Sequence, residues 1–358
     1  MRITSLGSGS SGNAYLVEAG PQRRTRLLVD AGFHMRVLRE RLGLVGCTPG
    51  DLRGVLITHE HSDHIMGLPP LLKYYQVPVY ADPRTLGEVR AIIAKGEMRS
   101  ETGALVRLEV EPGTPAMDGA DQPVLLPPAL IEAAPAMDGA DQPALLPPAP
   151  IEAVPAVERS AAQETILALR KARLPWDADL LWQALPEGTS CVIGDIEVCS
   201  FPVSHDAIAP CGYLLSAGGC RVCIITDSGK VTPVMLEALA QADLLILEAN
   251  HDRARLLNGP YPYSLKQRIL SATGHLSNAQ AAEAVLHTWR SDAVRWLWLA
   301  HLSRTNNTHK LALTSMQESL RWAGASLEQL HITVLSHEMG GTWDSSRLWI
   351  DDHLWKMV

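Results

Sequence analysis

The residues most able to perform chemistry lie in one run, His-Glu-His-Ser-Asp-His at positions 59–64. Four of its residues are metal-ligand types, because imidazole and carboxylate groups bind zinc, manganese and iron. The run follows an apolar segment with the length and composition of a buried strand. A tight loop at that strand end can direct His59 and His61 to one ion while Asp63 and His64 face a second. The run therefore predicts a metal site.

Three further metal-ligand residues stand directly after other apolar, strand-like segments: His205, Asp227 and His301. Asp30 is a strand-end acid of the same kind. A single histidine after a strand is more often structural than a ligand. Together with the run at 59–64, however, these residues complete two sites, so we predict that the fold gathers them.

The elements that must position these residues alternate between strand and helix patterns, which predicts an α/β protein with helices covering sheets. The tryptophans at strand and helix spacing are predicted to lie in the core: Trp289, Trp296, Trp298 and Trp322. We predict strands at residues 2–6, 14–18, 26–30, 54–58, 78–81, 191–201, 211–216, 221–226, 244–247, 294–300 and 331–335, and helices at 37–42, 67–75, 85–95, 277–289 and 309–322.

A change of composition divides these elements into two blocks. Residues 115–134 are followed by a near copy at 135–154, a tandem repeat with a period of 20 residues. Two copies are too few to stack into a solenoid, and their prolines disfavour helix and sheet alike. We therefore predict a single domain formed by residues 1–95 and 180–358, with a mobile, low-complexity insertion at 96–179.

Composition excludes several classes of protein. The 358 residues are 46% hydrophobic and 20% charged, which is ordinary for a globular chain, and the net charge of −8 excludes a simple basic nucleic-acid coat protein. The charge is uneven, because the repeat region at 115–154 contains six acidic residues and no Lys or Arg. Removing those six acids leaves −2, which gives room for a local basic groove elsewhere.

The expected location is the cytoplasm, without a membrane partner. The first residues lack the long apolar run of a signal peptide, and no stretch approaches the roughly 20 apolar residues of a membrane span. The six cysteines are few for this length, and we expect reduced thiols. Cys220 and Cys223 form a C-x-x-C pattern inside a strand, which favours packed core thiols over a zinc or redox site.

With these motifs in view, the sequence resembles the metallo-β-lactamase superfamily and, within it, is similar to the YycJ (WalJ)-like group. The segments that carry the resemblance are 59–64, residues 5–13 (SLGSGSSGN), 204–207 (SHDA), 274–278 (GHLSN) and 300–307 (AHLSRTNN). The resemblance covers about residues 1–95 and 180–335. It implies an αββα four-layer sandwich with the metal site at the sheet ends. The insertion departs from the short connection that the family has there.

The resemblance also implies a role for each ligand. The first ion would be held by His59, His61 and His205. Asp63, His64 and His301 would hold the second, and Asp227 would bridge the two. Asp30 would lie behind the ligands and orient the histidine loop. The implied cofactors are two divalent ions, zinc or manganese with iron possible, and a bridging carboxylate favours a true two-metal site.

The function that this resemblance implies is a dinuclear metal-dependent hydrolase, in the first place a phosphodiesterase that acts on double-stranded DNA as a 5′→3′ exonuclease. A hydroxide bridging the metals would attack phosphorus. The candidate catalytic residues are Asp63 and His275, with His275 as substrate contact or general acid beside a helix N-terminus. The candidate substrate-binding residues are Ser8, Ser10, Asn13, Ser277, Asn278, Ser303, Arg304 and Asn306.

The same residues could instead have purely structural roles. Residues 7–13 could form a plain hairpin turn, His275 could cap a helix, and the residues after 301 could form a polar turn. Two other functions also stay open. One is a different hydrolase on the same metals, such as a lactonase, thioesterase or cyclic-nucleotide phosphodiesterase. The other is a non-catalytic, metal-loaded scaffold. A basic path from the metals would favour the nuclease, and a closed small pocket would favour another hydrolase.

Overall fold

The computed structural model describes residues 1–99, 105–107, 175, 177–291 and 293–348, all of which belong to one unit formed by Met1–Val110 and Ala172–Val358. The tandem repeat at 115–154 lies outside the described residues, so a mobile insertion stays a prediction. Within the range predicted as insertion, β6 (Glu97–Arg99) and β7 (Leu105–Arg107) form an antiparallel pair.

Two seven-stranded sheets form the centre of this unit. The first has the order β16 (Gly340–Asp344), β1 (Arg2–Gly7), β2 (Ala14–Ala19), β3 (Thr25–Val29), β4 (Gly54–Leu56), β5 (Val79–Ala81) and β8 (Trp182–Ala184). The second has the order β15 (Leu330–Val334), β14 (Arg295–Ala300), β13 (Leu244–Glu248), β12 (Cys220–Ile225), β11 (Cys211–Ala217), β10 (Ile196–Pro202) and β9 (Ser190–Ile193).

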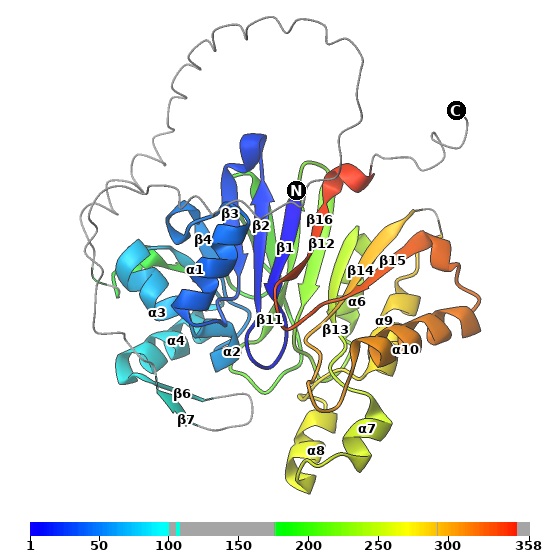
Figure 1. The fold of residues 1–358 in the computed structure, drawn as a ribbon. Coiled ribbons are helices and arrows are strands. Elements are labelled where there is room, and N and C mark those ends of the chain that lie inside the picture. Colours follow the sequence, from blue (N-terminus) through cyan, green and yellow to red (C-terminus); the bar gives the residue numbers. More distant parts are fainter. Residues whose placement is uncertain (100–104, 108–174, 176, 292, 349–358) are drawn as a thin grey trace, which may run out of the picture. The chain divides into compact units, whose positions relative to one another are not determined.

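Both sheets are mixed, and their central strands are buried on both faces, which explains why those strands are almost continuously apolar. Successive side chains of a strand point to opposite faces, so each strand supplies two cores. In β2, Tyr15 and Val17 pack between the sheets, whereas Leu16 packs under the helices of the first sheet. In β14, Trp296 and Trp298 lie between the sheets. This arrangement confirms the predicted four-layer αββα sandwich (Figure 1).

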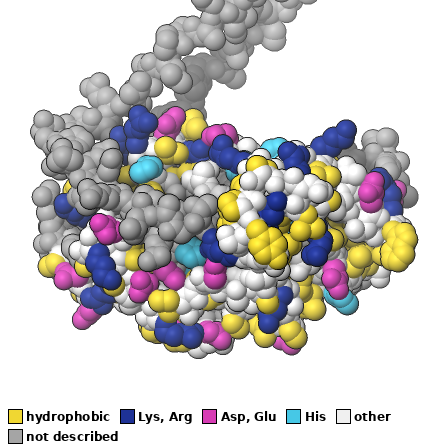
Figure 2. Space-filling model, turned by 90° about the horizontal axis from the view of Figure 1, so that it is seen from below, with side chains coloured by type: hydrophobic (Ala, Val, Ile, Leu, Met, Phe, Trp, Pro, Cys, Tyr) yellow, Lys and Arg dark blue, Asp and Glu magenta, His cyan; other side chains and the backbone are white. Residues whose placement is uncertain are grey.

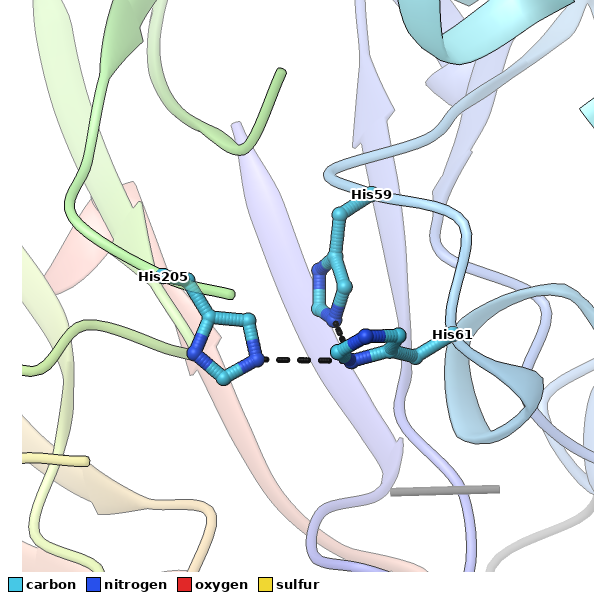
Figure 3. A group of neighbouring side chains, drawn as sticks. All are labelled: His59, His61 and His205. Atoms are coloured by element: carbon cyan, nitrogen blue, oxygen red, sulfur yellow. Dashed lines mark hydrogen bonds between the residues drawn. The ribbon is translucent and has the colours of Figure 1, made fainter. Parts of the chain in front are cut away.

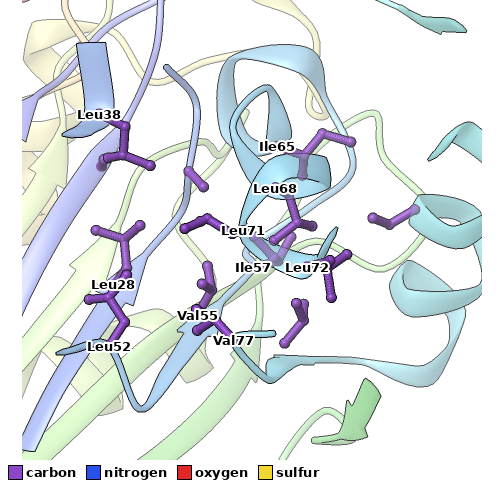
Figure 4. Packing of buried hydrophobic residues seen from close by; sticks show 14 of the residues in the cluster. Leu28, Leu38, Leu52, Val55, Ile57, Ile65, Leu68, Leu71, Leu72 and Val77 are labelled. Atoms are coloured by element: carbon purple, nitrogen blue, oxygen red, sulfur yellow. The ribbon is translucent and has the colours of Figure 1, made fainter. Parts of the chain in front are cut away.

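Helices cover the outer face of each sheet. On the first sheet, Leu38 and Leu42 of α1 pack with strand residues such as Leu28 and Val55 (Figure 4). Burying each such side chain contributes about 1.5–3 kcal/mol. On the second sheet, α6, α9 and α10 cover the outer face.

The helices are α1 (Met35–Leu44), α2 (Ser62–Ile65), α3 (Leu68–Pro70), α4 (Pro83–Lys95), α6 (Pro233–Gln241), α7 (Arg253–Asn258), α8 (Tyr263–Leu270), α9 (Asn278–His287) and α10 (His309–Trp322). Shorter helical turns are η1 (Pro21–Arg23), η2 (Pro49–Asp51), η3 (Leu71–Tyr75), η4 (Asp179–Leu181), η5 (Leu327–Gln329) and η6 (Ser345–Leu348).

The structure differs from the sequence prediction in several elements. The strand predicted at 191–201 is a hairpin, because Gly194 turns the chain with a φ of 62°. The helices α6, α7 and α8 and the strands β8 and β16 were not predicted. The prediction of a core position was wrong for Trp322, which ends α10 and is 93% exposed. It was right for Trp296 and Trp298, which are buried.

Two expectations about the chain as a whole can be compared with the structure. All six cysteines are free thiols, and Cys220 and Cys223 are buried in β12. Within the described part of the chain, no helix combines the length and the apolar composition needed to cross a membrane.

Candidate metal centre

The predicted metal ligands all follow strands that end at the same edge of the two sheets. In the first sheet β3 and β4 run parallel. In the second, β12, β13 and β14 run parallel, and β10 shares their direction because β11 is antiparallel to both β10 and β12. The carboxyl ends of parallel strands meet at one edge, so the loops after them converge there. The structure thereby brings together all seven predicted ligands: His59, His61, Asp63, His64, His205, Asp227 and His301.

Three imidazoles form the first group. His59 Nε2 lies 3.1 Å from His61 Nδ1, and His205 Nε2 lies 3.3 Å from the same atom (Figure 3). The other ring nitrogen of His205 donates to the carbonyl of Gly274 at 3.0 Å, which leaves Nε2 as the nitrogen with a lone pair. Three ring nitrogens that face one another in this way suit one cation better than they suit mutual hydrogen bonds.

A second group joins Asp63, His64 and His301. His64 Nε2 lies 3.3 Å from Asp63 Oδ2, and His301 Nε2 lies 3.5 Å from the same oxygen. Asp227 stands between the groups, with Oδ2 3.2 Å from His64 Nε2 and Oδ1 3.0 Å from His301 Nδ1. It also forms a group with His59 and His64, so its carboxylate adjoins both predicted sites.

Asp30 lies directly behind these ligands and is fully buried. Its Oδ2 accepts from His64 Nδ1 at 2.8 Å, while Oδ1 accepts from the backbone N–H and the hydroxyl of Thr58 at 2.9 and 3.0 Å. These contacts fix the ring of His64 with Nε2 turned toward the other ligands. They also tie the end of β3 to the start of the histidine loop.

The electrostatics differ between the two groups of ligands: the imidazoles of His59 and His205 are favoured in the neutral form, whereas His64 lies beside concentrated negative charge. Burial lowers the pKa of His205 to about 4 and, with the nearby His64, lowers the pKa of His59 well below its usual value. Burial would also lower the pKa of His64, but the carboxylates of Asp30, Asp63 and Asp227 raise it well above its usual value. The cluster is thus built to hold positive charge.

These residues fit two divalent metal ions. The donor set consists of imidazole nitrogens and carboxylate oxygens, which suits zinc, manganese or iron. Asp63 Oδ1 is buried and has no hydrogen-bond partner among the described residues, so it has an oxygen to offer to an ion. The groups of possible ligands have their atoms within 4.8 Å of one another.

The N-terminal loop predicted to bind phosphate contains two buried residues that contact the ligands. Ser8 Oγ accepts from the backbone N–H of His301 at 2.9 Å. Asn13 Nδ2 donates to Asp63 Oδ2 at 3.3 Å and lies 3.2 Å from His64 Nε2. We propose that Ser8 and Asn13 position ligands. Ser10, in contrast, is exposed and lines a pocket together with His275 and Ser303.

A buried acid that the sequence analysis missed, Glu248, supports His275. Glu248 ends β13, and its Oε1 lies 2.7 Å from His275 Nδ1 and 3.2 Å from His301 Nδ1. Its Oε2 accepts from the backbone N–H groups of Ser228 and Leu276 at 2.8 and 3.1 Å. The signal that could have found Glu248 is the same strand-end position that pointed to Asp30 and Asp227.

Of the other residues predicted to bind substrate, four are buried and one is exposed to solvent. Ser277 caps α9 through a capping box with Gln280, and Asn278 exchanges hydrogen bonds with Asn307, so both are engaged in the fold. Asn306 and Ser303 are buried. Arg304 is exposed, and its Nη2 donates to Ser11 Oγ at 3.1 Å.

Two stretches of the chain match known family models. Residues 7–140 match the model described as the metallo-beta-lactamase superfamily, and residues 146–295 match a beta-lactamase superfamily domain. Among solved structures, the metallo-beta-lactamase fold protein YhfI from Bacillus subtilis covers 96% of this chain and 99% of its own, with a TM-score of 0.52 and 16% identity. Zinc-bound PqqB from Methylobacterium extorquens covers 96% and 100%, with a TM-score of 0.52 and 14% identity. These similarities show a shared fold.

Relatives of known name align over most of the chain. The exodeoxyribonuclease WalJ of Streptococcus pneumoniae is 30% identical over 89% of this chain and 87% of its own length. The exodeoxyribonuclease YycJ of Bacillus anthracis is 28% identical over 90% of each.

Proposed function

Because this chain belongs to the metallo-β-lactamase superfamily, we propose that it uses two divalent metal ions to cleave the phosphodiester backbone of DNA. The chain is a metallohydrolase with buried His and Asp groups that can bind metal. The specific activity that we propose is that of an exonuclease, which degrades double-stranded DNA in the 5′→3′ direction.

The assignment of DNA as the substrate rests on the alignment with proteins named exodeoxyribonuclease, at 28–30% identity over 87–90% of their lengths. An alignment of that extent spans both sheets and every ligand-bearing loop. The cluster itself supports hydrolysis, since it can place an ion on each side of Asp227. A scaffold without activity has no need of such a cluster.

In the proposed mechanism His59, His61 and His205 would hold one ion, Asp63, His64 and His301 would hold the other, and Asp227 would be a ligand available to both. When bound, the two ions would lower the pKa of a water and stabilise the charge that develops on the phosphate. Asp63 is at once a ligand and a candidate catalytic residue. Asn13 holds it by donating to Oδ2.

His275 is proposed to give a proton to the leaving oxygen. Glu248 accepts from His275 Nδ1 at 2.7 Å, which fixes the orientation of the ring. His275 also lines a pocket with Ser10 and Ser303, where a substrate group could reach it. Positioned proton donors contribute about 10²- to 10⁴-fold to such reactions.

A second candidate substrate is a small phosphodiester. The pocket beside His275 has a volume of only about 50 Å³, which favours a small group over a duplex at that point. Another opening has a volume of about 590 Å³, and its lining includes Arg255 and Arg304. That basic lining favours the nucleic-acid substrate over the small one.

The proposal is tested with linear duplex DNA that carries a 5′-phosphate and a 3′ label. The protein is stripped with EDTA, and Mn²⁺ or Zn²⁺ is added back, with Asp227→Ala as the control. We expect metal-restored release of nucleotides from the 5′ end by the wild type only. No release by a wild type that binds two metal equivalents would contradict the DNA substrate and favour the small phosphodiester.

The role of His275 has its own test. His275→Asn should lose about 10²- to 10⁴-fold in turnover of DNA while it still binds two metal equivalents. Its loss on bis(p-nitrophenyl) phosphate should be much smaller, because nitrophenolate leaves without a proton. Equal losses on both substrates would show that His275 does not act as the proton donor.

A further inference from the structure

Between β13 and α9 the chain forms a pair of short helices, α7 and α8, which we call the basic arm (residues 253–270). It carries four cationic residues and no Asp or Glu, in a chain whose net charge is −8: Arg253, Arg255, Lys266 and Arg268. Figure 1 shows the arm at one end of the unit, below α9 and α10. Figure 2 views that end and shows basic and hydrophobic side chains side by side.

Two of the four cations hold the arm together. Arg268 pairs with Asp206 at 2.5 Å. Lys266 Nζ donates to the carbonyls of Leu257 and Gly259 at 2.9 and 2.7 Å, at the end of α7. These contacts give Lys266 and Arg268 a structural role.

Among the described residues, the side chains of the other two cations, Arg253 and Arg255, form no hydrogen bond or salt bridge within the arm. Both are exposed; Arg253 is the first residue of α7, and Arg255 lies in its last turn. Arg255 Nε donates to the Thr305 carbonyl at 3.1 Å, which places its guanidinium beside Arg304. In the part of the chain that the structure describes, no salt bridge involves Arg253, Arg255 or Arg304. Their charge is thus available to an anionic partner.

The arm adjoins the candidate active site. Tyr261, Leu265 and Arg268 of the arm form one side of the pocket that contains His275. The groove lined by Arg255 and Arg304 has a volume of about 590 Å³. Ser303 lines the pocket and its neighbour Arg304 lines the groove, so the two openings meet at adjacent residues.

The tip of the arm presents apolar surface to solvent. Tyr263 is 77% exposed and Leu257 is 46% exposed. Exposed aromatic side chains next to cations are the combination by which proteins hold single strands, because bases stack on the rings while the cations contact phosphates.

We propose that the basic arm binds the DNA strand next to the metal centre: Arg253, Arg255 and Arg304 contact backbone phosphates, and Tyr263 stacks on a base. This inference rests on the proposed nuclease function. The occupant is nucleic acid because the arm carries only positive charge and borders the pocket of His275. The arm would hold the substrate while the ligand cluster cleaves it.

The test measures binding of a fluorescein-labelled, 5′-phosphorylated duplex with a single-stranded end, in EDTA so that no cleavage occurs. The variants are Arg253→Gln, Arg253→Gln/Arg255→Gln and Tyr263→Ala. The matched control is Arg24→Gln/Arg221→Gln, which removes two exposed arginines. They lie before β3 and at the start of β12, at the ends of these strands that are farthest from the metal ligands. Because each lost phosphate contact reduces the salt slope by about 1, the double arm variant should lose about 2 from the slope.

We expect the double arm variant to bind DNA at least about 10-fold more weakly and Tyr263→Ala to lose about 10-fold through lost stacking, while the control binds as the wild type does. Arm variants with the affinity and salt slope of the wild type would overturn the inference, even if the wild type cleaves DNA. Cleavage of DNA by the wild type with Mn²⁺ is measured in parallel, and its absence overturns the proposed function instead. Self-association that is lost in Tyr263→Ala, with unchanged DNA binding, would assign the arm to a second copy of the chain and also overturn the inference.

Discussion

Replacing Asp30 by Asn should weaken one metal site selectively. Asp30 has a φ of 59°, a left-handed conformation that Asn tolerates well, so the variant keeps the backbone and the shape of the side chain. The amide oxygen can still accept from Thr58, but the amide N–H₂ then faces His64 Nδ1. His64 must move its proton to Nε2, the atom that lies 3.2–3.3 Å from the oxygens of Asp227 and Asp63. Nε2 would lose the lone pair that a metal ion requires.

Loss of a partner behind a metal-binding histidine costs about 10- to 100-fold in metal affinity. That range corresponds to about 1.4–2.8 kcal/mol at one of the two ions. Among the described residues, Asp30 has no direct hydrogen bond with His59, His61 or His205, and its link to His59 runs through the hydroxyl of Thr58, which Asn can still bind. The ion of that group should therefore bind as in the wild type. Competition of the EDTA-stripped protein with a metal-binding dye for Zn²⁺ would resolve the two affinities.

The control for this experiment is Asp243→Asn. Asp243 accepts from the backbone N–H of Arg221 at 2.8 Å and precedes β13, at the end opposite the ligands. It should bind both equivalents normally. If Asp30→Asn also binds both equivalents as tightly as the wild type, then Asp30 does not orient His64 and the reasoning fails.

Three further substitutions have defined outcomes. Ser8→Ala leaves the buried backbone N–H of His301 without its acceptor and should reduce the free energy of unfolding by about 1–3 kcal/mol, measured with urea. His61→Ala should reduce bound metal from two equivalents to one, measured by elemental analysis, and abolish metal-restored turnover. Asp82→Ala removes the side chain that accepts from Arg84 N at 2.9 Å and begins α4, and should cost about 1 kcal/mol at neutral pH. Burial raises the pKa of Asp82, but its hydrogen bonds with Arg84 outweigh this and lower the pKa below the usual value. The carboxylate therefore stabilises the fold above pH ~4, and this contribution is lost as the pH falls through the lowered pKa.

Each of these has a matched comparison. Ser10→Ala, in the same loop but exposed, should leave stability unchanged, and an equal loss in both serine variants would refute the role of Ser8. Two equivalents of metal in His61→Ala would show that His61 is not a ligand. Asp82→Asn keeps a capping oxygen without the charge. A stability difference between the wild type and Asp82→Asn that does not shrink as the pH falls would argue against the carboxylate.

The sequence predicted the ligand loops because buried strands are easy to recognise and each ends on a polar residue. His205, Asp227 and His301 each follow an apolar, strand-like segment. The end of a buried strand does not by itself require a metal-ligand side chain, so three such side chains indicate a site. Glu248 carried the same signal, but it follows a short all-apolar strand without a recognisable motif and was not singled out. Its importance depends on the register of β13 between its neighbours, which places it beside His275.

Other elements left weak local signals. The Gly-Gly start of β16 disfavours a strand, and tertiary contacts stabilise it: the pairing with β1 and the burial of Trp343 in the core. The helices α7 and α8 are short and separated by Gly259, Pro260 and Pro262, which resemble a loop. Trp322 lies two residues after the buried Leu320, about 200° around the helix, so it is on the face of α10 that points away from the sheet.

The ligand cluster takes its donors from both sheets. His59, His61, Asp63 and His64 come from the first sheet, whereas His205, Asp227 and His301 come from the second, and His61 and His205 are 144 positions apart in the chain. An ion held by donors of both sheets acts as a cross-link at their edge. By mass action it stabilises the packed arrangement by about 2.7 kcal/mol when free metal is 100 times its Kd. Metal supply therefore sets the resistance of this chain to unfolding and proteolysis as well as its capacity for chemistry.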